Sequence, residues 1–318
     1  MGNATLSGLW GTADGNTPAG ATYTITLKSN SLGCSVNGGF WAPNGGFNVN
    51  GTLIVDATNA TGSSVSIGSY GSSTYTGAII GSGGILMLLG NGTQGNANSL
   101  LGNTVQPNVN FFNIAGNTVN NGSIIINNTS LFNYQGTSSI TGSGSIVMNN
   151  VTLASDFRNN QYCYWNTTSM NISGQTIDMT NSQITFGDKN GNGSISNVTI
   201  NCNGGNNYIA INYGMVSNVS GLKIRGFGGG DKLDLGSYGY GDWCSYDPKT
   251  GILTISTYDS RGTVFSIPID IGLGYDPNGF SKEQFYTGTS GDAGITYLAA
   301  APCYLSGTLI ETAQLRHN

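Results

Sequence analysis

Two ten-residue segments near the middle of the chain are almost identical, and this repeat limits the possible folds more than any other feature. GSIIINNTSL begins at Gly122, and GSIVMNNVTL begins 22 residues later, at Gly144. Each has a glycine, a run of apolar residues, a pair of asparagines and a second short run with an apolar end. A repeat of this length indicates structural units that stack, because one unit cannot bury its apolar face alone.

Looser versions of the pattern occur on both sides of this pair. Their spacing varies from about 20 to about 40 residues, as expected where loops of different length separate equivalent strands. We therefore predict an all-β chain whose centre, residues 51–215, is a right-handed parallel β-helix. The looser copies are GTLIVDATN from Gly51, GGILMLLGN from Gly83, GQTIDMTNSQI from Gly174 and GSISNVTI from Gly193.

Within the units, we expect Ile125, Met148 and their equivalents to point into the core. The pairs Asn127–Asn128 and Asn149–Asn150 fall where the strands bend. Stacked asparagine side chains at these bends are expected to hydrogen-bond from one coil to the next. The main alternative is a two-sheet β-sandwich, which requires hairpins with two-residue turns, and the sequence has few clean examples of these.

The composition favours strands that are broken by turns. Charged residues make up 8% of the chain and hydrophobic residues 38%, which argues against disorder driven by charge. Residues 57–155 contain no Asp, Glu, Lys, Arg or His. The ten basic residues are dispersed, so nothing resembles a nucleic-acid surface. No apolar run approaches the ~18 residues of a membrane span.

Charge returns from about residue 216, which indicates a different module. The segment CSYDPKTGILTISTYDSRGTVFSIPID predicts an antiparallel hairpin around a Pro-Lys-Thr-Gly turn. SKEQF predicts one helical turn, with Ser281 as its N-cap. The predicted organisation is a cap with the first strands over residues 1–50, the parallel β-helix over 51–215, a β-rich capping module over 216–300 and a short segment over 301–318.

The five cysteines are scattered and form no Cys-X-X-Cys pair, so a zinc site is not expected. Their odd number leaves at least one of them unpaired. We interpret most of them as buried free thiols rather than as a disulfide framework. They are Cys34, Cys163, Cys202, Cys244 and Cys303.

The end of the chain carries a short motif made of Cys303, Tyr304, Leu305, Gly307, Thr308, Ile310 and Thr312. This motif resembles the first block of a Hint domain, the self-processing module of hedgehog proteins and inteins. The upstream GFGGGDKLDL and YDPKTGILTI are similar to the module that precedes Hint domains in bacterial β-helix surface proteins.

The resemblance implies that Cys303 attacks the carbonyl of Pro302. That step also needs a later histidine within a full domain, and His317 follows after only 14 residues. We therefore expect that Cys303 is a vestigial nucleophile and that the tail is inactive. The favoured expectation is that the chain is the passenger part of a longer precursor, and the alternative is a naturally short protein with a vestigial tail.

Parallel β-helices often carry polysaccharide lyases and hydrolases, which need paired carboxylates or a base with calcium and Arg. The candidates here are Asp156 with Arg158, and Asp178 with Asp188 on later coils. Acid pairs are more often structural than catalytic, so we expect no enzyme.

Two segments are candidate calcium sites. In DKNGNGSI the residues Asp188, Asn190, Asn192 and Gly193 have the spacing of the first half of an EF-hand loop, but Thr199 stands where its glutamate is expected. The favoured interpretation is a Gly-Asn turn. GGGDKLDL, with Asp231 and Asp234, is similar to the last turn of a calcium-binding β-roll repeat.

The favoured function is a non-enzymatic structural or adhesive protein, extracellular or at the cell surface. The alternatives are a carbohydrate-active enzyme and a carbohydrate-binding protein whose exposed aromatic side chains stack on the sugar rings of an extracellular polysaccharide. Packing in the core or cap is the favoured role of these aromatics. They are Trp41, Tyr162, Tyr164, Trp165, Tyr238, Tyr240 and Trp243.

We also predict that the protein associates with itself as a multimer or fibre. Few charges protect its strand edges from pairing with other chains. The segment ATYTITLK, from Ala21 to Lys28, is a strand that can cap its own first coil or pair with a neighbour. The tail with Leu309 and Ile310 is a second such strand. One free strand at each end favours head-to-tail contacts.

Overall fold

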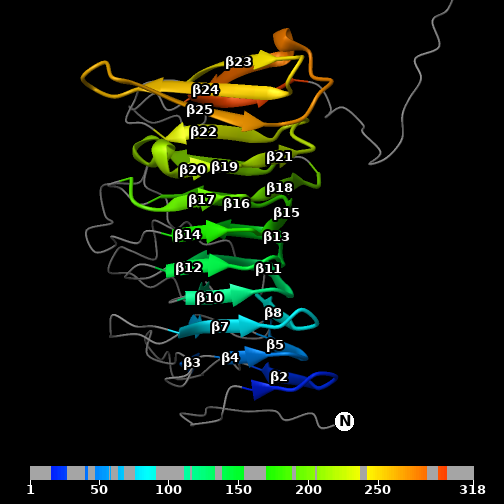
Figure 1. The fold of residues 1–318 in the computed structure, drawn as a ribbon. Helices are drawn as coiled ribbons and strands as arrows, with labels where there is room; N and C mark the ends of the chain where they lie inside the picture. The colour runs from blue at the N-terminus through cyan, green and yellow to red at the C-terminus, as the bar shows by residue number, and fades with distance from the viewer. Residues whose placement is uncertain are drawn as a thin grey trace, which may run out of the picture.

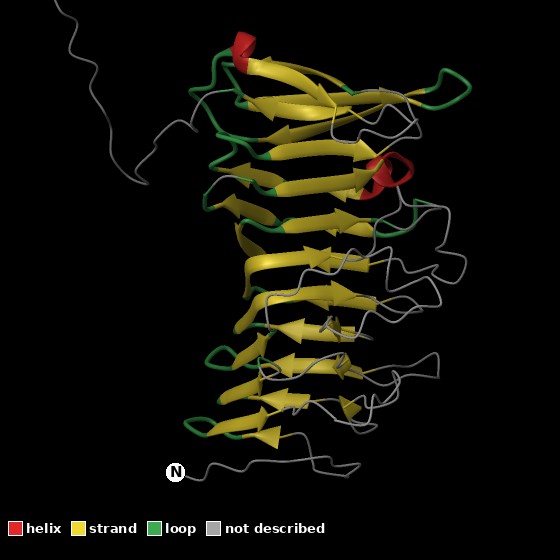
Figure 2. Cartoon of the chain, turned by 180° about the vertical axis from the view of Figure 1, so that it is seen from behind, coloured by secondary structure: helices red, strands yellow, loops and turns green. Residues whose placement is uncertain are grey.

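The computed structural model is all-β, as predicted, with sheets of parallel strands (Figure 1). Two 3-10 helices, η1 (Tyr213–Asn218) and η2 (Pro277–Gly279), are the only helices in the described part; Figure 2 shows both among the C-terminal strands. No described helix is long and apolar enough to cross a bilayer. The structure describes residues 16–26, 40–41, 47–56, 58, 64–67, 76–90, 111–114, 117–132, 138–153, 170–187, 191–204, 206–236, 242–284 and 293–298.

The strands form three parallel ladders, in which each strand pairs with the equivalent strand of the next repeat unit. The first ladder contains β2 (Thr22–Thr26), β5 (Thr52–Asp56), β8 (Ile85–Leu89), β11 (Ser123–Phe132), β13 (Ser145–Leu153), β15 (Thr176–Thr180), β18 (Thr199–Cys202) and β21 (Lys223–Arg225).

The second ladder also uses the C-terminal halves of β11 and β13. Its other strands are β3 (Phe40–Trp41), β6 (Ser64–Ile67), β9 (Phe111–Ile114), β16 (Gln183–Phe186), β19 (Tyr208–Asn212) and β22 (Lys232–Gly236). Parallel pairing therefore extends beyond residue 215, to β22.

The third ladder is a separate sheet of eight strands. They are β1 (Asn16–Thr17), β4 (Phe47–Val49), β7 (Thr76–Ile80), β10 (Asn117–Asn120), β12 (Ser138–Thr141), β14 (Met170–Ser173), β17 (Ser194–Ser196) and β20 (Val219–Ser220). Neighbouring strands along the chain do not form the hairpins of a β-sandwich in this part.

Alternate residues of each strand face the core between the ladders, as the period of two requires. In β11 the buried side chains are Ile124 and Ile126, and in β13 they are Ile146 and Met148. The prediction was correct for Met148 but wrong for Ile125, which is half-buried and faces outward. Ile126, not Ile125, pairs with Met148, and a shift of one residue moves a side chain to the opposite face.

The asparagine pairs lie at the bend between the first and second ladders, as predicted. Asn128 and Asn150 have φ angles of 51° and 52°, which asparagine tolerates better than most residues. The Nδ2 of Asn149 donates to the Oδ1 of Asn127 at 2.8 Å, and that of Asn150 to Asn128 at 3.0 Å. The predicted hydrogen bonds between asparagines of successive repeat units are confirmed.

The repeat glycines stack at the turn between the third and first ladders. A Cβ on Gly122 would lie 2.2 Å from the carbonyl oxygen of Gly84, and one on Gly144 would lie 2.5 Å from that of Gly122. Glycine at these positions lets consecutive backbones approach closely.

Beyond β22 the first and second ladders continue into antiparallel sheets. The first ladder is extended by β25 (Val264–Asp270), which pairs parallel with β21, and then by β24 (Ile252–Tyr258) and β23 (Trp243–Asp247) in antiparallel pairs, which include the predicted hairpin. The second is extended by β27 (Ala293–Tyr297) and β26 (Phe280–Gln284). The predicted helical turn at Ser281 is wrong, because this segment pairs with β27, and tertiary pairing overrides weak local propensity.

An aromatic core lies between these two extensions. It consists of Tyr246, Tyr275, Phe280 and Tyr297, with ring centroids 4.9 Å apart for Tyr275 and Tyr297 and for Phe280 and Tyr297. The aromatic side chains close the apolar interior of the stack where its parallel strands end.

Candidate functional site

A buried column of polar side chains runs along the bend between the first and second ladders. The Ser182 hydroxyl donates to the carbonyl oxygen of Met148 at 3.0 Å, and the Ser182 amide donates to the Oδ1 of Asn207 at 3.1 Å. The backbone amide and the Nδ2 of Asn207 then donate to the Oδ1 of Asp231, at 3.0 and 2.9 Å. This column joins successive coils and supplies partners for polar groups inside the stack.

Asp231, a predicted calcium ligand, is the last member of this column. Its Oδ2 accepts the amide of Gly228 at 3.0 Å, so N–H donors reach both of its carboxylate oxygens. Burial raises the pKa of Asp231, and these donors oppose that rise. Burial, together with the neighbouring Asp231, also raises the pKa of Cys202. Among the described cysteines, Cys202 and Cys244 are free thiols, as interpreted from the sequence.

A second acidic group lies at the change from parallel to antiparallel strands. Asp234 in β22 accepts a hydrogen bond from the hydroxyl of Tyr208, and Asp242 accepts the amide of Leu235 at 2.7 Å. Burial and the adjacent Asp234 raise the pKa of Asp242 to about 9. Asp234 and Asp242 are only 2% and 1% exposed, so a substrate cannot reach this pair.

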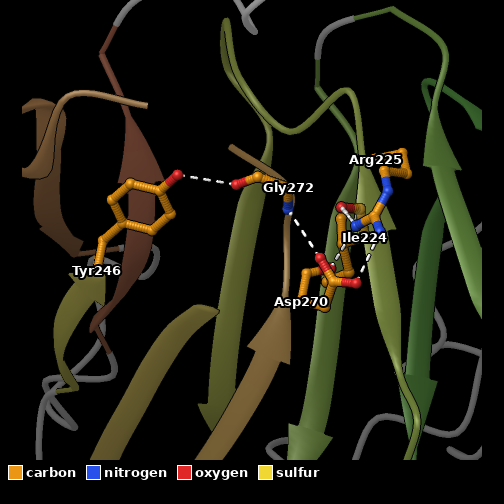
Figure 3. A network of polar contacts seen from close by, with 5 residues as sticks. All are labelled: Ile224, Arg225, Tyr246, Asp270 and Gly272. Atoms are coloured by element: carbon orange, nitrogen blue, oxygen red, sulfur yellow. Dashed lines mark hydrogen bonds and ion pairs between the residues drawn. The ribbon is translucent and has the colours of Figure 1, made fainter. Parts of the chain in front are cut away.

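A partly buried polar clamp joins the antiparallel extension to β21 of the first ladder (Figure 3). The guanidinium of Arg225 donates to the Oδ2 of Asp270 at 2.8 Å and to its carbonyl oxygen at 2.6 Å. Burial opposes ionisation of Asp270, but Arg225, the Gly272 amide and Lys223 together outweigh it and lower the pKa of this carboxyl. The amide of Gly272 donates to Asp270, and its carbonyl oxygen accepts the hydroxyl of Tyr246 at 2.8 Å.

Another buried polar pair consists of Gln175, which stands where other repeat units have a glycine, and Asn120. Gln175 occupies the position that follows Gly144 in the stack, and it is 1% exposed. Its Oε1 accepts the Nδ2 of Asn120 at 2.8 Å, and its Nε2 donates to the carbonyl oxygen of Gly142 at 2.8 Å. This pair was not predicted from the sequence, although a glutamine at a glycine position of the repeat is a usable signal.

The other predicted site residues are not brought together by the described structure. Asp178 faces outward from β15 and accepts the Nδ2 of Asn201 at 2.7 Å, as a rung between coils. Asn192 is exposed, and Thr199 lies in β18. Calcium binding stays a prediction, since Asp188 and Asn190 lie outside the described residues. So do Asp156, Arg158, and Cys303 with the rest of the Hint-like tail.

Of the predicted aromatic residues, Trp243 is described with its side chain, and it is 43% exposed. Its ring lies 5.9 Å from that of Tyr258, which the sequence analysis did not select. Trp41 belongs to β3, but its side chain lies outside the described part. The remaining predicted aromatic residues lie wholly outside the described part: Tyr162, Tyr164, Trp165, Tyr238 and Tyr240.

Residues 180–305 match the family model of the hyphally regulated cell wall protein N-terminal domain. The match includes the last parallel coils, the buried acids and the antiparallel extension. It points to a location at the cell wall or cell surface. No curated protein matches the chain. The match does not test the Hint resemblance, which stays a prediction.

Proposed function

We propose, from the match to a family of cell wall proteins, that this chain is a non-catalytic structural or adhesive protein of the wall or surface. Its repeat units form the coils of a right-handed parallel β-helix, and the antiparallel strands close one end. The three parallel ladders support this arrangement, because each successive unit adds one strand to each ladder.

The observation that carries the proposal is that the acidic side chains form hydrogen bonds within the chain. Every described aspartate accepts a hydrogen bond from the chain itself. Asp178, Asp231 and Asp270 bond residues of neighbouring strands or units, and several others cap turns, as Asp247 does for the amide of Lys249 at 2.9 Å. They are Asp56, Asp178, Asp231, Asp234, Asp242, Asp247, Asp259, Asp270 and Asp276.

This use differs from that of a polysaccharide lyase or hydrolase. Such an enzyme needs an exposed acid and base that a sugar can reach. The adjacent acid pair, Asp234 and Asp242, is enclosed, and Asp178 is held by a neighbouring coil. A structural protein uses the same bonds to keep its coils in register.

The proposal is tested by incubating the purified chain with pectin, alginate, cellulose, β-glucan and chitin. We expect no new reducing ends and no unsaturated products. Asp178→Asn is the informative variant, and Asp247→Asn, which changes a turn-capping acid, is its control. A product that forms with the wild type and the control, but not with Asp178→Asn, contradicts the proposal.

Self-association into a multimer or fibre is a second part of the proposal. Within the described residues, β2 at one end pairs only with β5, and β23 at the other end pairs only with β24. Each end therefore presents a strand edge that another copy can extend. We expect light scattering coupled to size exclusion to detect multimers that become smaller when residues 1–28, which include β2, are deleted. Deletion of residues 303–318 tests the tail strand that was predicted from the sequence. A monodisperse monomer at high concentration contradicts this part alone.

A further inference from the structure

An exposed aromatic pair lies on the outward face of the antiparallel extension. Trp243 in β23 lies directly across from Ser256 in β24, and Tyr258 lies two residues further along β24. The two rings are 5.9 Å apart and tilted by 40°. Trp243 is 43% exposed and Tyr258 38%, whereas the tyrosines of the aromatic core are buried. These two rings are therefore not needed to fill the interior.

The strand residues around this pair are neutral, and the turn that follows Tyr258 carries one acid and one base, Asp259 and Arg261. Val264, across from Tyr258 in β25, is 58% exposed. The hydroxyls of Ser256 and Ser266 share a hydrogen bond of 2.7 Å next to the rings, and Ser266 is the exposed member, since Ser256 is only 7% exposed. On the same face, Asp247 and Asp270 lie at the opposite ends of the strands. The aromatic end of the sheet is thus apolar and hydroxyl-bearing, and the acidic end is separate from it.

We propose that Trp243 and Tyr258 form a binding platform for a neutral polysaccharide. Sugar rings have one apolar face of C–H groups, which packs on an aromatic ring, and an edge of hydroxyls, which hydrogen-bonds to serines. Charge complementarity favours a neutral glycan, because the basic groups described near this face lie beside acids: Arg225 pairs with Asp270, and Arg261 lies near Asp259. The inference rests on the proposed function, in which the chain lies within a wall.

The platform is held by a packed support. The alternate residues of β24, Leu253 and Ile255, face the other way and are fully buried, and Tyr246 of β23 belongs to the aromatic core. Substitutions at Trp243 or Tyr258 therefore change the outward surface and leave the interior packed. This separation allows binding and folding to be measured independently.

The test measures binding of the full chain to insoluble β-glucan particles and chitin beads, with alginate as the acidic comparison. We expect saturable binding to at least one neutral polysaccharide and not to alginate. Trp243→Ala and Tyr258→Ala each weaken it about tenfold, and Trp243→Phe retains most of it. Leu273→Ala is the matched control, since Leu273 is 49% exposed and lies beyond the acidic end. It leaves binding unchanged.

Fluorescence gives a second readout, because Trp243 is one of four tryptophans. Soluble β-glucan oligosaccharides shift the emission of the wild type, and the shift is absent in Trp243→Phe. Three results overturn the inference: no binding to either neutral polysaccharide, equal binding by wild type and Trp243→Ala, or self-association that requires Trp243. Failure of the glycan experiment leaves the non-catalytic wall role intact, because the degradation assay tests that role separately.

Discussion

The buried acid pair makes the stability of the protein depend on pH in a direction that can be worked out. Asp242 lies beside Asp234 in a site with almost no exposure, and its pKa in the folded protein is about 9. An unfolded aspartate titrates near 3.9. Between about pH 4 and pH 9 the folded protein therefore keeps a proton that the unfolded chain has released.

Because the unfolded state binds fewer protons in this window, the free energy of unfolding falls as pH rises. One proton contributes a slope of up to about 1.4 kcal/mol per pH unit. The stabilisation is fully present below about pH 4 and is lost as pH rises to about 9. Tyr208 bonds Asp234, and Cys244 lies near Asp242. Burial and Asp242 raise the pKa of Cys244 to about 11, which lies outside this pH window.

The perturbation is Asp242→Asn, which keeps an oxygen for the amide of Leu235 and removes the titrating proton. We expect its stability to fall much less steeply than that of the wild type between pH 5 and pH 9. The measurement is urea unfolding followed by circular dichroism at one-unit pH steps. Comparing slopes avoids any dependence on the absolute stability of the variant.

Asp247→Asn, at the end of the strand β23 that begins directly after Asp242, is the control. Hydrogen bonds from the Lys249 amide and the Thr250 hydroxyl lower the pKa of Asp247, so its contribution is lost only as the pH falls into the acid range. We expect its curve to run parallel to that of the wild type from pH 5 to pH 9. If Asp242→Asn is also parallel to the wild type, the raised pKa and the reasoning from burial are refuted.

Three further predictions concern the coils and the tail. Gly122→Ala places a Cβ 2.2 Å from the Gly84 oxygen and should lower the free energy of unfolding in urea by about 1–3 kcal/mol. Gly83→Ala, whose Cβ has nothing within 4 Å, is the control and should lower it less. Equal effects of the two substitutions contradict the close approach. Asn149→Ala removes the hydrogen bond to Asn127 and should lower the free energy of unfolding by about 1 kcal/mol. An unchanged stability would mean that this asparagine bond contributes nothing. We expect the intact mass to stay constant in dithiothreitol or hydroxylamine, and a product ending at Pro302 would show that Cys303 is active.

The features predicted correctly from the sequence depend on residues that are close in the chain. The 22-residue repeat gives the parallel stacking of β11 on β13, because identical units bury identical faces. Asn128 and Asn150 predict the bends, since asparagine tolerates a positive φ. The Pro-Lys-Thr-Gly turn predicts the hairpin of β23 and β24. Turn chemistry and periodicity are local properties, so one sequence is enough to find them.

The remaining features depend on pairing between distant residues, and only the tertiary structure decides them. Register places Ile124 and Ile126, not Ile125, in the core, and pairing with β27 makes a strand of the segment from Ser281. Hydrogen bonds and charge interactions act over short distances, so the properties of a site depend on which residues the fold brings together. Asp242 keeps its proton because the fold encloses it beside Asp234, and Trp243 gains its aromatic neighbour Tyr258 because β23 pairs with β24 in one register.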